Sequence, residues 1–366
     1  MRKAVRRKPA PAEPGAPAVA GGVDNAAPEA APINRDDPLF QLLLRCYGRS
    51  PSAPDVARWA ERIERRPAIG MFLRQLSETP SFVANRQVPV KNPAGHYFSP
   101  VVDPDSVVDY VARERTAGIG DVQGIDFDLL SMERFWRAHR EVIASAPFSD
   151  EPDGVHRYFF NGGPYAHGDA IMLRTMIHAF APRRIVEIGS GYSTACMLDC
   201  AEEFALRDLL LTCIEPYPAR LKSILREQDG AHVTILEQNV QSVSLDLFRQ
   251  LERNDILFID STHVLKTGSD VHYELFKVLP VLKPGVLVHF HDCRWPFEYT
   301  DVQIFQKNYS WNEAYGVRAL LMWSTRFKVI FYGSLFEIER PALIAATCPI
   351  FLKNAGSAIW LQVQEY

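Results

Sequence analysis

Residues 185–194, with the sequence IVEIGSGYST, constrain the fold more than any other stretch of the chain. The β-branched beginning is typical of a buried parallel strand. Gly189 and Gly191 then allow a tight turn into a following helix and a close approach of the backbone to a ligand. Because a helix amino terminus presents free N–H groups, we predict a cofactor-binding turn that includes Gly189, Ser190 and Gly191. Two glycines alone are a weak signal, so the surrounding elements must decide.

Strand and helix patterns alternate after this turn. Strand patterns recur at 209–215, 232–236, 255–260, 285–291, 327–332 and 357–364, with helical patterns between most of them. Alternation of this kind predicts a doubly wound parallel sheet with helices on both faces. The last two strands are suited to an antiparallel hairpin that closes the sheet. We therefore predict an α/β fold with a seven-stranded, Rossmann-like sheet and a C-terminal antiparallel hairpin.

Two carboxylates bear on the kind of cofactor. Glu215 ends the second strand, where a carboxylate can accept hydrogen bonds from both hydroxyls of a ribose. Glu187 precedes the glycine turn, and Ser193 or Thr194 stands near the place of the third glycine of the pyrophosphate-binding fingerprint. S-adenosylmethionine (AdoMet) carries a cationic amino group and no pyrophosphate. This pattern therefore favours AdoMet over NAD.

The motifs resemble, in their order, those of class I AdoMet-dependent methyltransferases. They are EIGSG beginning at Glu187, Glu215, FID ending at Asp260, and LKPG leading into the strand that reaches His289. The resemblance covers roughly 155–335, and it implies a methyltransferase domain over 151–366. It also implies a set of cofactor-binding residues: Glu187, Gly189, Ser190, Gly191, Glu215, Asn239 and Asp260. Asn239 could equally be an ordinary loop asparagine.

The DSTH run beginning at Asp260 and the HFHD run ending at Asp292 resemble segments of metal-dependent small-molecule O-methyltransferases. In those enzymes an acid ends strand four, and an acid–amide or acid–acid pair ends strand five. That pair falls on His291 and Asp292, and the family's catalytic lysine falls on His263. The resemblance implies Asp260 and His263 as catalytic residues and Asp260, His291 and Asp292 as ligands of a divalent Mg, Mn, Fe or Zn ion. Both histidines depart from the family pattern, which leaves the metal and the base open.

The first 150 residues have a different character. Residues 1–35 are rich in Ala and Pro and predict a disordered tail. Residues 36–87 show helical spacing and predict a small all-α module, which resembles the domain of unknown function 4214. That domain accompanies bacterial surface and glycan-related proteins. Residues 88–150 predict an irregular, partly helical cap or linker, with a helix near 129–145.

The composition and net charge of the chain limit the classes of partner that it is expected to bind. A net charge of −4 over 366 residues gives no field that favours nucleic acid. No apolar run reaches the roughly 18 residues needed to span a bilayer, and the basic start leads into no apolar signal region. A cytoplasmic location is expected. The six cysteines show no paired spacing, so we expect buried free thiols. A homo-oligomer is left open.

The leading hypothesis is AdoMet-dependent O-methylation of a small-molecule or saccharide hydroxyl, with or without a divalent metal. Its base would be His263, the side chain type that titrates near neutrality. Arg294, Trp295 and Glu298 follow the fifth strand and are candidates for the acceptor pocket. Methylation at N or C stays open, as do a non-catalytic AdoMet-binding or interaction protein and an NAD-dependent oxidoreductase.

Overall fold

The computed structural model describes residues 37–47, 53–65, 95–165 and 167–365. The chain divides into two compact units, Met1–Lys91 and Asn92–Tyr366. The predicted tail at 1–35 lies outside the described residues, as does the later part of the predicted module, 66–87. The domain boundaries and the resemblance of the module to the domain of unknown function 4214 therefore stay predictions.

Two helices are described in the first unit, α1 (Pro38–Tyr47) and α2 (Ala53–Arg65). Asp37 accepts hydrogen bonds from the backbone N–H of Leu39 (2.6 Å) and Phe40 (3.3 Å), so its side chain caps the beginning of α1. The two helices contact each other and carry buried apolar side chains, which are Phe40, Leu43 and Trp59. Their contact is the described core of this unit.

The second unit is built around a seven-stranded sheet. Its strands are β1 (Arg184–Ile188), β2 (Leu210–Ile214), β3 (Val233–Leu236), β4 (Ile256–Ile259), β5 (Leu287–Phe290), β6 (Phe327–Tyr332) and β7 (Ile359–Val363). Their order is β3-β2-β1-β4-β5-β7-β6. Strands β1 to β5 pair in parallel, whereas β7 is antiparallel to both β5 and β6. The predicted doubly wound sheet with an antiparallel C-terminal pair is confirmed.

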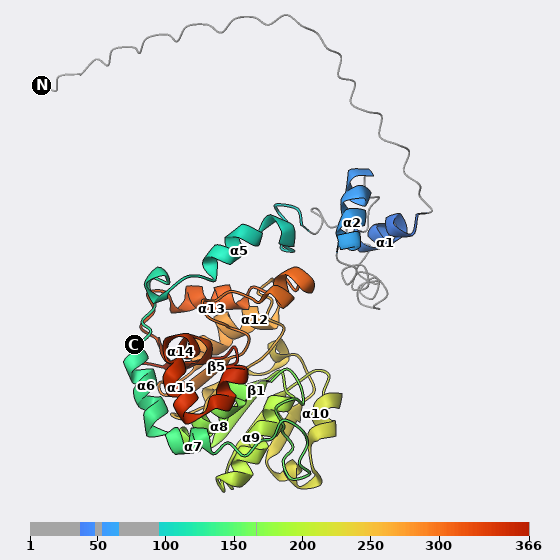
Figure 1. Cartoon of the computed structure of the whole chain (residues 1–366). Coiled ribbons are helices and arrows are strands. Elements are labelled where there is room, and N and C mark those ends of the chain that lie inside the picture. Colours follow the sequence, from blue (N-terminus) through green and yellow to red (C-terminus); the bar gives the residue numbers. More distant parts are fainter. Residues whose placement is uncertain (1–36, 48–52, 66–94, 166, 366) are drawn as a thin grey trace, which may run out of the picture. The chain divides into compact units, whose positions relative to one another are not determined.

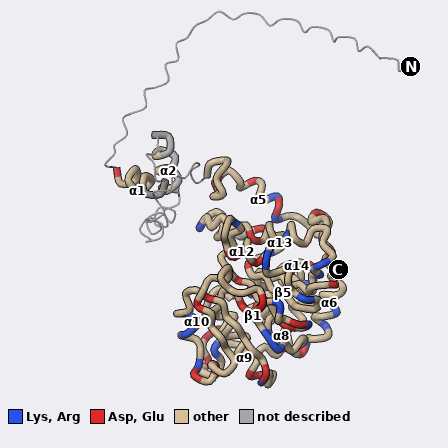
Figure 2. The backbone as a smooth tube through the Cα atoms, turned by 180° about the vertical axis from the view of Figure 1, so that it is seen from behind, with Lys and Arg blue, Asp and Glu red and all other residues tan. Residues whose placement is uncertain are grey.

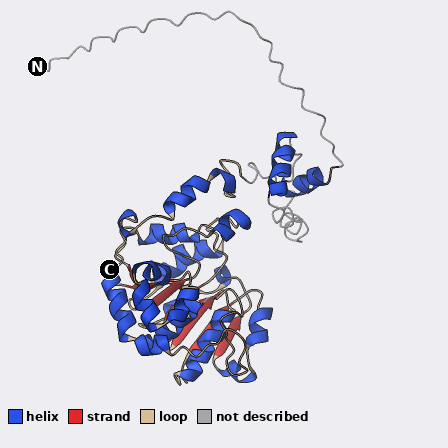
Figure 3. Ribbon diagram, viewed as in Figure 1, coloured by secondary structure: helices blue, strands red, loops and turns tan. Residues whose placement is uncertain are grey.

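Helices flank this sheet (Figures 1 and 3). Helix α8 (His167–Phe180) leads into β1. The helices between and after the parallel strands are α9 (Tyr192–Glu203), α10 (Ala219–Ile224), α11 (Leu245–Arg249), α12 (Asp270–Tyr273) and α13 (Glu313–Leu321). Helix α12 continues into a π-helical turn, Glu274–Val278, and a 3-10 turn, Leu279–Val281. The strongly apolar α8 and α9 pack on each other and on the sheet, because most of their side chains are buried.

Further helices precede the sheet and separate its last two strands. They are α5 (Val108–Glu114), α6 (Leu129–Ala138), α7 (Arg140–Ala144), α14 (Gly333–Glu339) and α15 (Pro341–Thr347). Trp136 of α6 is fully buried and stacks on Phe331 of β6, with ring centroids 6.2 Å apart. Helices α14 and α15 were not anticipated from the sequence. They make the connection between β6 and β7 much longer than a hairpin turn.

Short irregular turns complete the second unit. These are the 3-10 turns Pro104–Ser106, Ile119–Asp121, Glu227–Ala231, Val240–Ser242 and Pro349–Lys353 and the π-helical turn Val302–Gln306. Arg157 ties one of them to α9. Its buried guanidinium pairs with Asp199 (2.8 Å), Glu202 (2.6 Å) and Asp229 (2.5 Å). Three carboxylates around one buried cation fix the segment that leads into α8.

The charged side chains of the second unit are mixed in sign (Figure 2), and its cysteines are buried. Lys and Arg alternate with Asp and Glu over the second unit, without a face of one sign in this view (Figure 2). Among the residues described, no helix is long and apolar enough to cross a membrane. The described cysteines are buried free thiols, as expected: Cys196, Cys200, Cys213, Cys293 and Cys348. Nothing is described of the Cys46 side chain.

Candidate active site

The turn after β1 packs against the end of β4. Gly189 has a φ of +80°, and a Cβ at this position would lie 1.9 Å from the backbone oxygen of Asp260. Only glycine fits there. Gly191 differs, because its φ of 176° is ordinary extended backbone. Its Cβ would lie 3.5 Å from Cδ of Arg220, an ordinary contact. The protein itself therefore requires the first glycine and leaves open space at the second.

Glu187 lies beneath this turn and is fully buried. It accepts a hydrogen bond of 2.5 Å from the Ser193 hydroxyl and another from the Thr194 hydroxyl, which in turn accepts one from the backbone N–H of Gly191. Burial raises the pKa of Glu187 to about 7, although these hydrogen bonds oppose the shift. The two hydroxyls that replace the third glycine thus anchor Glu187. This geometry gives Glu187 the role of ordering the turn, and direct contact with a cofactor stays a prediction.

A cavity of about 470 Å³ opens at the carboxyl ends of β1, β2 and β4. Four of the predicted cofactor-binding residues line it, namely Gly189, Glu215, Asn239 and Asp260. Glu215 also accepts hydrogen bonds from the backbone N–H of Ser190 (3.2 Å) and Tyr217 (2.8 Å). The structure thus brings together residues from four strand ends around one space, which is where open α/β sheets bind ligands.

A cluster of acids and histidines lies at the ends of β4 and β5. Asp260 Oδ1 is 3.4 Å from His263 Nε2 and 3.3 Å from His291 Nδ1. Asp292 Oδ2 is 3.6 Å and 3.8 Å from the same two nitrogens. All four residues of this cluster were predicted as catalytic or metal-binding residues from the sequence. The structure places them within contact distance of one another.

Two further acids complete the cluster. The Glu313 carboxylate, at the beginning of α13, accepts a hydrogen bond of 2.7 Å from His263 Nδ1. Asp169 of α8 lies 3.4 Å from His291 Nε2. Neither acid was predicted from the sequence. Glu313 is 50 positions from His263, and an acid in the first turn of a helix is too common to stand out.

The two imidazoles of the cluster are strongly biased toward their charged forms. Burial alone would lower the pKa of His263, but hydrogen bonds to Asp260 and Glu313 outweigh it and raise the pKa to about 10. Burial is likewise outweighed at His291, whose pKa is raised well above its usual range by the charges of Asp260 and Asp292. The same contacts hold the pKa of Asp260 well below its usual value despite burial. The carboxylates of the cluster therefore favour the protonated form of both imidazoles.

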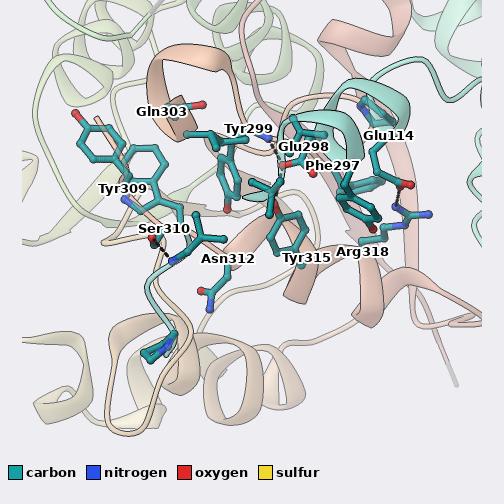
Figure 4. Close-up of a pocket in the computed structure, with 18 residues that line it drawn as sticks. Glu114, Phe297, Glu298, Tyr299, Gln303, Tyr309, Ser310, Asn312, Tyr315 and Arg318 are labelled. Atoms are coloured by element: carbon teal, nitrogen blue, oxygen red, sulfur yellow. Dashed lines mark hydrogen bonds and ion pairs between the residues drawn. The ribbon is translucent and has the colours of Figure 1, made fainter. Parts of the chain in front are cut away.

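A second cavity, of about 360 Å³, is lined by residues of α5, of α13 and of the segment between β5 and α13 (Figure 4). Trp311 lines this cavity, and its ring centroid is 4.3 Å from that of His263. The backbone N–H groups of Asn312 and Glu313 both donate to the carbonyl of His263, at 3.0 and 3.2 Å. His263 therefore contacts one residue of each cavity, Asp260 of the first and Trp311 of the second. Of the three acceptor-pocket candidates, Glu298 lines the second cavity and Arg294 and Trp295 do not.

Comparisons with known proteins agree with this arrangement. A family model described as a methyltransferase domain matches residues 186–293. An uncharacterized protein of Archaeoglobus fulgidus is 32% identical over 183 residues, which cover 47% of this chain and 79% of the archaeal protein. The matched region contains the glycine turn, Glu215 and both strand ends of the cluster. The chain belongs to the class I AdoMet-dependent methyltransferases.

Solved structures with detectable similarity to this methyltransferase are distant. A methyltransferase of Podospora anserina, bound to S-adenosylhomocysteine, is 14% identical, with a TM-score of 0.36, and the match covers 71% of this chain and 95% of that one. An O-methyltransferase of Streptomyces achromogenes involved in tomaymycin synthesis, in complex with AdoMet, is 15% identical. Its TM-score is also 0.36, over 66% of this chain and 92% of that one.

The predicted metal site of the methyltransferase is not shown. A metal ion needs the lone pair of a neutral imidazole, and in this structure both imidazoles of the cluster face the carboxylates of Asp260 and Asp292 at 3.3 to 3.8 Å. Within the described part of the chain, no group of three or more His, Cys, Asp or Glu side chains is arranged to hold a metal ion. As placed, these side chains form ion pairs with one another, and a metal at this position stays a prediction.

Proposed function

We propose that this methyltransferase transfers a methyl group from AdoMet to a hydroxyl of a small molecule or saccharide. The observation that carries the proposal is the position of His263. Its Nε2 faces Asp260 of the first cavity, and its ring contacts Trp311 of the second. A base that contacts residues of both a cofactor cavity and an acceptor cavity can assist methyl transfer to a hydroxyl.

We assign the first cavity to AdoMet, which supplies an electrophilic methyl group on a sulfonium when bound. Glu215 would hold the ribose hydroxyls, because each carboxylate oxygen retains a free lone pair beside its present backbone hydrogen bond. Gly189, Ser190 and Gly191 would pass beneath the cofactor, and Asn239 and Asp260 would close the cavity. The open Cβ position at Gly191 supports this assignment, because no packing within the protein demands a glycine there.

His263 is the proposed base, and Glu313 holds it in one tautomer. The buried Glu313 carboxylate accepts the Nδ1 proton at 2.7 Å, which leaves Nε2 to take the proton of the acceptor hydroxyl. Because the pKa of His263 is raised to about 10, this nitrogen must first lose its own proton. A cationic ligand beside Asp260 would help, since it competes for the carboxylate that stabilises the imidazolium. We therefore expect turnover to rise with pH toward 10.

A metal-assisted version of the same reaction is the second candidate. One observation favours it: both ring nitrogens of the buried His291 lack a hydrogen bond among the described residues, although Asp260 and Asp292 lie within 3.8 Å. A divalent Mg, Mn, Fe or Zn ion could bind Asp260, His291 and Asp292 if these side chains moved and His291 lost its proton. EDTA decides between the versions. Turnover that survives EDTA supports the metal-free base, and turnover abolished by EDTA with AdoMet binding intact supports the metal.

The acceptor can be found by comparing cells with and without this enzyme. Small molecules that accumulate in its absence are incubated with the full chain and AdoMet carrying a deuterated methyl group, and mass spectrometry locates the label. We expect the label on an oxygen. His263→Ala should lose most of this transfer while binding AdoMet normally. Unimpaired transfer by His263→Ala would remove the base assignment, and label on nitrogen or carbon would replace O-methylation.

A further inference from the structure

We propose that the second cavity selects acceptors that carry a positively charged amino group, which Glu298 binds within an aromatic enclosure. The inference rests on the proposed function, because it names the substrate class of the same active site. The amino group is the handle for recognition. The hydroxyl that receives the methyl group is a different part of the molecule, placed near His263.

The walls of this cavity are largely aromatic. Tyr110 comes from α5 and Tyr315 from α13, and the segment between β5 and α13 supplies the remaining rings (Figure 4). The aromatic lining residues are Tyr110, Phe297, Tyr299, Tyr309, Trp311 and Tyr315. Faces of such rings carry partial negative charge and attract ammonium groups, most strongly where water is excluded. Three of these rings, Tyr110, Tyr309 and Tyr315, are also exposed to solvent, and an aromatic lining of this kind suits an organic cation better than an anion.

Glu298 places a carboxylate side chain in the wall of this cavity. Its exposed fraction is only 6%. One carboxylate oxygen, Oε1, accepts hydrogen bonds from the hydroxyl of Tyr315 (2.6 Å) and the backbone N–H of Tyr299 (2.9 Å). Burial and the contact with Glu298 raise the pKa of Tyr315, so this hydroxyl stays protonated and donating. These contacts hold the carboxylate in place at the cavity wall.

Glu298 has no cationic partner among the residues that the structure describes. In the described part of the chain, no Lys, Arg or His forms an ion pair with it, and the cavity lining holds one cationic side chain, Arg318. Arg318 is committed to another acid of the lining, Glu114, at 4.0 Å. A buried carboxylate without an opposite charge is costly. A bound ammonium group would relieve this cost, whereas a neutral saccharide hydroxyl would only hydrogen-bond.

A pair of related phenols tests the charge preference on the full chain. Tyramine and 4-ethylphenol share a phenol and a two-carbon tail, and only tyramine carries an ammonium group. Titration calorimetry in the presence of S-adenosylhomocysteine should show tyramine binding at least about tenfold more tightly. Glu298→Gln should remove most of this advantage and leave 4-ethylphenol binding unchanged. The matched control is Glu114→Gln, which alters the acid already paired with Arg318 and should change tyramine binding much less.

The outcomes separate this inference from the proposed function. Equal binding of the two probes by the unmodified protein, or tighter binding of methyl glucoside than of tyramine, overturns the amine preference without using any variant. An undiminished tyramine advantage in Glu298→Gln overturns the role of Glu298. Titration of S-adenosylhomocysteine alone reports on the cofactor cavity and on the folding of each variant. A protein that binds this cofactor product but shows no preference for tyramine keeps the proposed function and loses the inference.

Discussion

Replacing Glu313 by glutamine should lower the pKa of His263. The amide is isosteric with the carboxylate and can still accept a hydrogen bond from Nδ1, but it carries no charge. Glu313 is almost completely buried and lies 2.7 Å from the imidazole. The change therefore isolates the electrostatic contribution of one carboxylate while the packing around it is kept.

The expected decrease in the pKa of His263 follows from the increase that its neighbours produce in the folded protein. The pKa of His263 is raised from 6.5 to about 10, and a difference of about 3.5 units corresponds to about 5 kcal/mol. Asp260 and Glu313 produce this increase together, against the opposing effect of burial. Loss of one carboxylate should lower the pKa by roughly one to two units, or about 1.5 to 3 kcal/mol.

Stability should depend on pH in the same sense. Since the pKa of His263 is higher in the folded protein, its protonated form stabilises the fold fully below about pH 6.5. That contribution is lost as the pH rises through about 10. In Glu313→Gln the contribution should be smaller and should disappear at lower pH. Urea denaturation between pH 6 and pH 10 measures the difference in the free energy of unfolding.

The assay for the pKa itself is NMR titration of the histidine rings, with His263→Gln used to assign the signal. We expect the His263 signal to titrate near pH 10 in the unmodified protein and clearly lower in Glu313→Gln. Asp260→Asn should give a second, independent decrease. An identical titration midpoint in the unmodified protein and in Glu313→Gln would refute the reasoning, because the charge of Glu313 would then have no influence on the imidazole.

Three further predictions concern the scaffold. Gly189→Ala should destabilise the protein by roughly 3 kcal/mol or more in urea denaturation, because its Cβ would meet the Asp260 backbone. Gly191→Ala is the matched control and should destabilise the protein much less. Equal losses of stability would contradict the different roles of the two glycines. Arg157→Met should cost about 3 to 5 kcal/mol by leaving buried carboxylates unpaired, and an unchanged melting temperature would contradict this. A chain covering 92–366, the second compact unit, should bind S-adenosylhomocysteine as the full chain does, because every proposed site residue lies within it. Loss of binding in a folded truncation would show that the first unit completes the site.

Local sequence patterns were enough to predict the sheet but not every connection. The β-branched run before Gly189 and the strands that end at Glu215 and Asp260 have strong, short-range signals, because buried parallel strands are continuously apolar. Helices α14 and α15, between the last two strands, were missed. Their segment, 333–353, mixes small, apolar and charged residues and was not recognised as two short helices.

In the site too, residues with a local sequence signal were predicted, and residues that packing brings in from distant parts of the chain were missed. Glu215 was predicted because it directly follows a strand. Asp260, His291 and Asp292 were predicted from the resemblance to metal-dependent O-methyltransferases, which have such residues at the ends of strands four and five. Glu313 was missed because its role depends on the packing of α13 against His263, which no local pattern reveals. The expectation that His263 titrates near neutrality used the ordinary value of the side chain. The neighbouring carboxylates raise its pKa to about 10 in the folded protein.

Binding of AdoMet to the first cavity is the central claim, and titration calorimetry of the full chain tests it most directly. The chain should bind AdoMet in preference to NAD, and Glu215→Ala should weaken binding about 100-fold through the loss of two hydrogen bonds to a carboxylate. Glu237→Ala, an exposed acid paired with Lys222 and outside the cavity lining, should bind as the unmodified protein does. Equal affinity of Glu215→Ala and the unmodified protein for AdoMet, or a preference for NAD, would contradict the account.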